Sequence, residues 1–94
     1  MLTYIKKEDV RQIASRLLDE AKTLSNDISI DPLQWGKSVK YKGSVLFYWE
    51  PRQACIRIST YGEDGEWEGS NISSDEQYTQ MIEQIKSNLK SYDK

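Results

Sequence analysis

The chain has 94 residues, of which 37% are hydrophobic and 30% are charged, and its formal net charge is −2. This length suits one α+β domain spanning residues 1–94, with one modest core and no room for a separate cofactor domain. The slightly acidic balance argues against a polybasic contact with nucleic acid or with a membrane surface.

The side-chain inventory limits the chemistry further. The chain has no histidine and a single cysteine, Cys55. Histidine is the commonest general base and metal ligand, and a lone cysteine makes no internal disulfide. We therefore predict that the protein is not an enzyme and uses no cofactor and no metal. No apolar run is long enough to span a membrane and no signal peptide is recognised, so we expect a cytoplasmic protein without a membrane contact.

The first predicted element is a helix that begins near Lys6 and ends near Ser25–Asn26. Its apolar residues recur at intervals of three and four, which is the spacing of one helical face. They are Val10, Ile13, Ala14, Leu17, Leu18, Ala21 and Leu24. Residues 26–37 follow as a connection that we expect to wrap the core and bury some of its large apolar side chains.

Residues 38–61 are predicted to form an antiparallel hairpin around which the rest of the chain is organised. Residues 38–50 alternate between two faces, as in a half-buried strand. Val39, Tyr41, Val45, Phe47 and Trp49 share the inward parity, whereas Leu46 falls on the outward one. Pro51 closes this strand, and residues 54–61 form the second, with Ala54, Ile56 and Ile58 facing inward.

A turn over residues 62–65 leads to a third predicted strand near residues 66–72. Ser73-x-x-Glu76 and Ser74-x-x-Gln77 each match a capping box that opens a second helix. Its apolar stripe is Tyr78, Met81, Ile82, Ile85, Leu89 and Tyr92. The predicted fold is a two-layer α+β sandwich of order α-β-β-β-α. Its three-stranded antiparallel sheet carries both amphipathic helices on one face.

The first candidate surface is an acidic hairpin. Residues 58–85 contain seven carboxylates and no lysine or arginine. An aromatic anchor beside carboxylates that steer a cationic partner is a recurrent docking arrangement. The predicted partner-binding residues are Glu63, Asp64, Glu66, Trp67 and Glu68. We expect the partner to be a protein with a basic surface.

The second candidate surface is the outward face of the sheet. Its residues combine cations with aromatic rings, which hold nucleic acid through phosphate contacts and base stacking. They are Lys40, Lys42, Tyr48, Arg57 and Tyr61. A nucleic-acid-binding module is therefore the alternative function. The same face also suits a homodimer, so the sequence leaves monomer and homodimer open.

The order of the elements resembles that of double-stranded-RNA-binding domains. That family begins its last helix with a basic cluster, whereas residues 74–78 here read Ser-Asp-Glu-Gln-Tyr, which repels phosphate. Layout, small size and acidic balance are also similar to those of small phage-encoded inhibitors, including some anti-CRISPR proteins. That resemblance implies an inhibitor or small regulatory protein that occupies a site on a larger partner.

Overall fold

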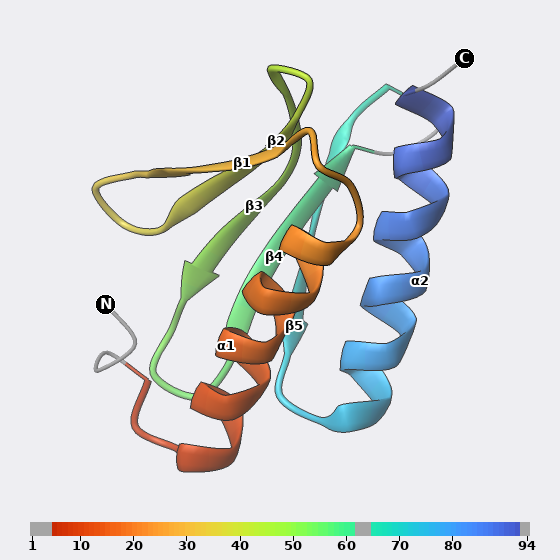
Figure 1. The fold of residues 1–94 in the computed structure, drawn as a ribbon. Coiled ribbons are helices and arrows are strands. Elements are labelled where there is room, and N and C mark those ends of the chain that lie inside the picture. Colours follow the sequence, from red (N-terminus) through yellow and green to blue (C-terminus); the bar gives the residue numbers. More distant parts are fainter. Residues whose placement is uncertain (1–4, 62–64, 93–94) are drawn as a thin grey trace.

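The computed structural model describes residues 5–61 and 65–92. It is an α+β protein in which two helices flank a five-stranded antiparallel sheet along the chain (Figure 1). The elements are α1 (Glu8–Thr23), β1 (Ile28–Pro32), β2 (Lys37–Tyr41), β3 (Ser44–Pro51), β4 (Ile56–Tyr61), β5 (Trp67–Ile72) and α2 (Asp75–Tyr92). The strands lie in the order β1-β2-β3-β4-β5, so each pairs with the next one along the chain. The predicted α+β class is correct, and the predicted three-stranded sheet is wrong.

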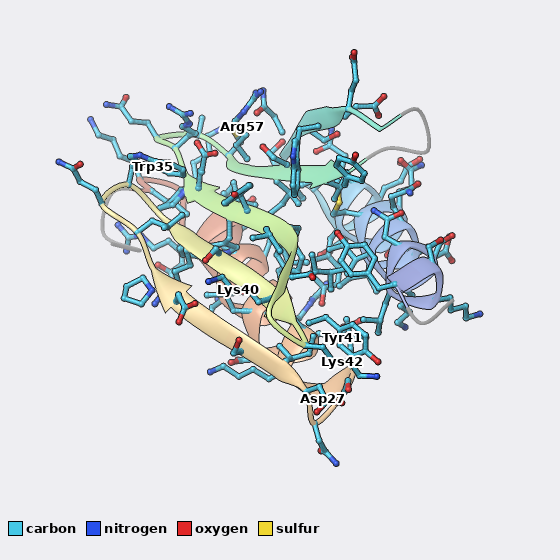
Figure 2. All side chains as sticks on the ribbon, turned by 90° about the horizontal axis from the view of Figure 1, so that it is seen from above. Asp27, Trp35, Lys40, Tyr41, Lys42 and Arg57 are labelled. Carbon is cyan, nitrogen blue, oxygen red and sulfur yellow. The ribbon has the colours of Figure 1, made fainter. Side chains whose placement is uncertain are left out.

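One additional strand arises because residues 38–50 are two strands and not one. Lys42 and Gly43 have φ angles of 52° and 86°, and the residues on either side of them, Tyr41 and Ser44, are Cα partners. Two consecutive residues with positive φ form the tight hairpin turn that suits twisted strands, and glycine adopts this conformation without strain. The backbone N–H of Lys42 also donates to the carbonyl oxygen of Asp27 at 3.1 Å. Figure 2 shows Asp27, Tyr41 and Lys42 together at this end of the hairpin.

The other additional strand is β1, which lies within the predicted connection over residues 26–37. Ile28 and Ile30 pair with Tyr41 and Val39 of β2. A loop closed by a 2.8 Å hydrogen bond from the N–H of Leu33 to the carbonyl oxygen of Gly36 joins the two strands. β1 is an edge strand, and this position tolerates a proline such as Pro32 because one side of the strand needs no ladder donor.

A β-bulge changes which side chains of β3 face the core. Val39 of β2 pairs with Phe47, and the next residue, Lys40, pairs with Val45, so Leu46 is left without a partner. A bulge places two residues of one strand opposite one residue of the other and shifts the alternation. Leu46 and Phe47 are both fully buried, while Val45 is half-buried. The prediction that Val45 faces inward and Leu46 outward is therefore wrong.

The core lies between one face of the sheet and the two helices. Side chains from α1, α2 and strands β2 to β5 form one buried cluster, which places both helices on that face. Phe47, Trp49, Ile56 and Ile58 are fully buried there. The indole N–H of Trp49 donates to the carbonyl oxygen of Ala14 at 3.0 Å and so ties β3 to α1. Among the described residues, neither helix is both long and apolar enough to cross a membrane.

Two tyrosines of α2 connect this helix to the rest of the fold. The hydroxyl of Tyr78 donates to a carboxylate oxygen of Glu20 at 2.6 Å, and the guanidinium of Arg16 lies 4.2 Å from the centre of the Tyr78 ring. The hydroxyl of Tyr92 donates to the carbonyl oxygen of Val45, also at 2.6 Å. Burial raises the pKa of both phenols above the ordinary value of 10.0, and the hydrogen bond to Glu20 raises that of Tyr78 further.

We predict that the protein loses stability in alkali. The native state holds these two phenol protons more tightly than the unfolded chain does. The free energy of unfolding is therefore unaffected at neutral pH and falls as the pH rises above about 10. Urea denaturation at a series of pH values measures this slope. The double variant Tyr78→Phe, Tyr92→Phe should show a shallower decline, and an equally steep one would contradict the assignment.

Candidate functional site

Four aromatic side chains form a continuous row on the sheet face that points away from the helices. We call Trp35, Tyr48, Trp67 and Tyr61 the aromatic row. The ring centres of Trp35 and Tyr48 are 6.4 Å apart, those of Tyr48 and Trp67 are 5.1 Å apart, and those of Trp67 and Tyr61 are 5.4 Å apart. The row therefore crosses from the β1–β2 loop over β3 to strands β4 and β5.

The strand register explains why these rings meet. Tyr61 and Trp67 are direct partners across β4 and β5, so their side chains share a face. Tyr48 pairs with Ser59, and Ser59 pairs with Gly69. Because Ser59 has a small side chain, the rings of Tyr48 and Trp67 can approach each other across the intervening strand β4.

Much of the aromatic row is open to solvent. Trp35 is 54% exposed, Trp67 is 45% exposed and Tyr61 is 42% exposed, and these three are the large exposed hydrophobic residues of the described chain. Ser38, which lies opposite Tyr48 on the same face, is only 3% exposed, so the row also covers part of the sheet. A contiguous apolar patch of this kind on a small protein marks an interaction surface more often than scattered exposed residues do.

The charges on this face are balanced. The outward-facing strand residues include two cations, Lys40 and Arg57, and two carboxylates, Asp31 and Glu50. Lys40 forms an ion pair with Asp31 at 2.9 Å. Glu50 forms one with Arg52, which lies beyond the end of β3, also at 2.9 Å.

Arg57 lies along the sheet over Gly69. A Cβ atom at residue 69 would come within 2.2 Å of its guanidinium, so the absence of a side chain there provides its space. Figure 2 shows Arg57 and Trp35 on the side of the sheet away from α2. In the part of the chain that the structure describes, no carboxylate is within ion-pair distance of Arg57.

The residues of the predicted acidic hairpin do not share one face. Glu63 and Asp64 lie outside the described residues. Trp67 opens β5 on the outward face, whereas Glu68 has the opposite parity and pairs with Thr60, which faces the helices. Glu66 is exposed just before β5. The structure therefore places Trp67 among the tyrosines of the second candidate surface.

The structure places four of the five residues of the second candidate surface on one face of the sheet. Lys40, Tyr48, Arg57 and Tyr61 all have the outward parity. Lys42 does not belong to this face, because it lies in the β2–β3 turn with its ammonium 5.1 Å from the ring centre of Tyr41. The prediction placed it on the outward face because it treated the turn as part of a regular strand.

Trp35 is the residue that the sequence analysis did not assign to either surface. It lies in the β1–β2 loop and extends the aromatic row by packing on Tyr48. The sequence feature that points to this position is that Trp35 precedes Gly36 in a short segment between two alternating runs. That signal identifies a hairpin loop only once residues 26–37 are recognised as containing a strand.

Neither a metal centre among the described residues nor a match to a known protein assigns a chemistry to this chain. Within residues 5–61 and 65–92, no three acidic or cysteine side chains gather in a way that would hold a metal ion. A comparison with protein-family models, curated proteins and solved structures found no match.

Proposed function

We propose that the protein is a small non-enzymatic binding module of the cytoplasm that docks onto a larger protein through the aromatic row. An inhibitor or a small regulatory protein, of phage or mobile-element type, fits this description. The observation that carries the proposal is the exposure of Trp35, Trp67 and Tyr61 in one contiguous row on an open sheet face. Tryptophan and tyrosine supply most of the binding energy in protein interfaces because they bury a large area at little entropic cost.

The chemistry around the aromatic row favours a basic partner. Aromatic faces attract lysine and arginine side chains. Glu66 precedes Trp67, and Glu63 and Asp64 follow Tyr61 closely in the sequence. Carboxylates at the edge of an interface steer a cationic partner and mainly increase the association rate.

Two observations make nucleic acid the weaker alternative. The rings of Tyr48 and Tyr61 are inclined by 51° and 66° to that of Trp67, so they pack on one another and do not present parallel faces for successive bases. The outward-facing strand residues also include as many carboxylates, Asp31 and Glu50, as cations, Lys40 and Arg57, so this face lacks the excess positive charge that phosphate binding requires.

We predict that the double variant Tyr61→Ala, Trp67→Ala loses the partner while keeping its fold. Truncating two central aromatic anchors is expected to weaken binding by at least about thirtyfold. Affinity purification from a lysate, with and without nuclease, identifies the partner. Titration calorimetry with the purified partner then measures the loss, and circular dichroism confirms the fold.

A pair of charge variants separates steering from docking. Glu66→Lys and Glu83→Lys change the net charge equally, but Glu83 lies on α2. Glu66→Lys should slow association in a salt-dependent manner, and Glu83→Lys should have little effect. Recovery that nuclease abolishes, and that Lys40→Ala, Arg57→Ala reduces, would replace the proposal with nucleic-acid binding. A concentration-dependent dimer of the purified protein that Trp67→Ala disrupts would replace it with self-association.

A further inference from the structure

A groove between α1 and the β1–β2 hairpin lies on the helix-facing side of the sheet, away from the aromatic row. We call it the α1–β1 groove. It has a volume of about 400 Å³ and is lined by Leu18, Lys22, Ile28, Ile30 and Lys37. This volume is within the range of small-molecule sites and toward its lower end.

The floor of the α1–β1 groove is apolar. Leu18 projects from α1, and Ile28 and Ile30 project from β1. All three are only partly buried and pack against the edge of the core. The floor therefore exposes apolar surface that a hydrocarbon chain would cover.

The charged side chains that line the α1–β1 groove are both cations. Lys22 is in the last turn of α1 and is exposed. Lys37 opens β2 and pairs with Pro32 and Trp49. Because Trp49 is buried beneath α1, the side chain of Lys37 is on the same, helix-facing side. Among the described residues, no carboxylate lines the groove, and neither lysine has an acidic partner within ion-pair distance.

We propose that the α1–β1 groove binds a single-chain fatty carboxylate. The acyl chain would lie on Leu18, Ile28 and Ile30, and its carboxylate would be held by the ammonium groups of Lys22 and Lys37. Charge complementarity selects an anion, because the two lysines at this apolar surface have no counter-charge among the described residues that line the groove. The volume selects one short chain over a two-chain lipid. This inference does not depend on the proposed function.

Titration calorimetry with decanoate, below its micelle concentration, tests the proposal on the full chain. We expect saturable binding of one molecule per protein, with affinity rising by up to about tenfold for each pair of methylenes from hexanoate to decanoate. Decanol, which has the same chain without the charge, should bind at least about tenfold more weakly.

Two charge-matched double variants locate the site. Lys22→Gln, Lys37→Gln should weaken decanoate binding by about tenfold. Lys7→Gln, Lys90→Gln removes the same charge at exposed positions outside the groove and should leave the affinity unchanged. Absence of saturable binding, equal affinity for decanol, or equal losses in the two variants would each overturn the proposal. Circular dichroism of both variants excludes a loss of fold as the cause.

Discussion

Replacing Trp49 with alanine is expected to lower the free energy of unfolding by about 3–5 kcal/mol, which is a large part of the total stability of a domain of this size. Trp49 is fully buried and is the largest side chain in the core. The truncation leaves a cavity between β3 and α1. It also removes the hydrogen bond from the indole N–H to the carbonyl oxygen of Ala14, and the loss of this buried bond adds to the cost.

Urea denaturation followed by far-ultraviolet circular dichroism measures this effect. Trp35→Ala is the matched control, because it makes the same chemical change at a residue that is 54% exposed. We expect that control to cost less than about 1 kcal/mol. Trp49→Phe keeps most of the ring volume and should fall between the two, mainly reporting the lost hydrogen bond. Similar losses for Trp49→Ala and Trp35→Ala would show that the core is not organised around Trp49.

The second large effect is expected for Gly36→Ala. A Cβ atom at this position would lie 2.2 Å from the carbonyl oxygen of Trp49, which is far inside contact distance. The obstructing atom belongs to the backbone of β3, so the β1–β2 loop or the β2–β3 ladder must move. Overpacking of this kind costs about 1–3 kcal/mol or more. The displaced loop carries Trp35, so the aromatic row should be disturbed as well.

Thermal denaturation compares Gly36→Ala with Gly43→Asn. Gly43 has a φ angle of 86°, a Cβ atom added there would meet nothing within 4 Å, and asparagine tolerates that conformation. The Gly43→Asn variant should therefore change stability by less than about 1 kcal/mol. If Gly36→Ala were equally mild, the close approach of Gly36 to β3 would not exist in solution.

The sequence predicts both helices well because each has a complete apolar stripe at helical spacing and no interrupting glycine or proline. It predicts the number of strands poorly, for a physical reason visible at Gly43. A glycine within an alternating run fits a regular strand and a tight turn equally well from pattern alone. The inward position of Leu46 could not be predicted either, because a bulge depends on the pairing with the neighbouring strand and leaves no local pattern in the sequence.

The candidate site illustrates a different limit. The sequence suggests two separate surfaces, one around Trp67 and one containing Tyr48 and Tyr61. The structure unites these three residues because β5 pairs with β4 in a register that places Trp67 opposite Tyr61. Register over a short polar strand such as β5 is set by long-range packing, and parity along the chain does not reveal it.

The order of the strands in the sheet has a consequence for how the protein folds. Because every strand pairs with its neighbour along the chain, each pairing closes only a short loop and loses little chain entropy. No strand has to insert between two that have already joined. We therefore expect rapid folding for a sheet protein, since local pairing shortens the search that limits the folding rate. The docking of α1 against α2 joins the two ends of the chain and is the contact with the longest loop to close.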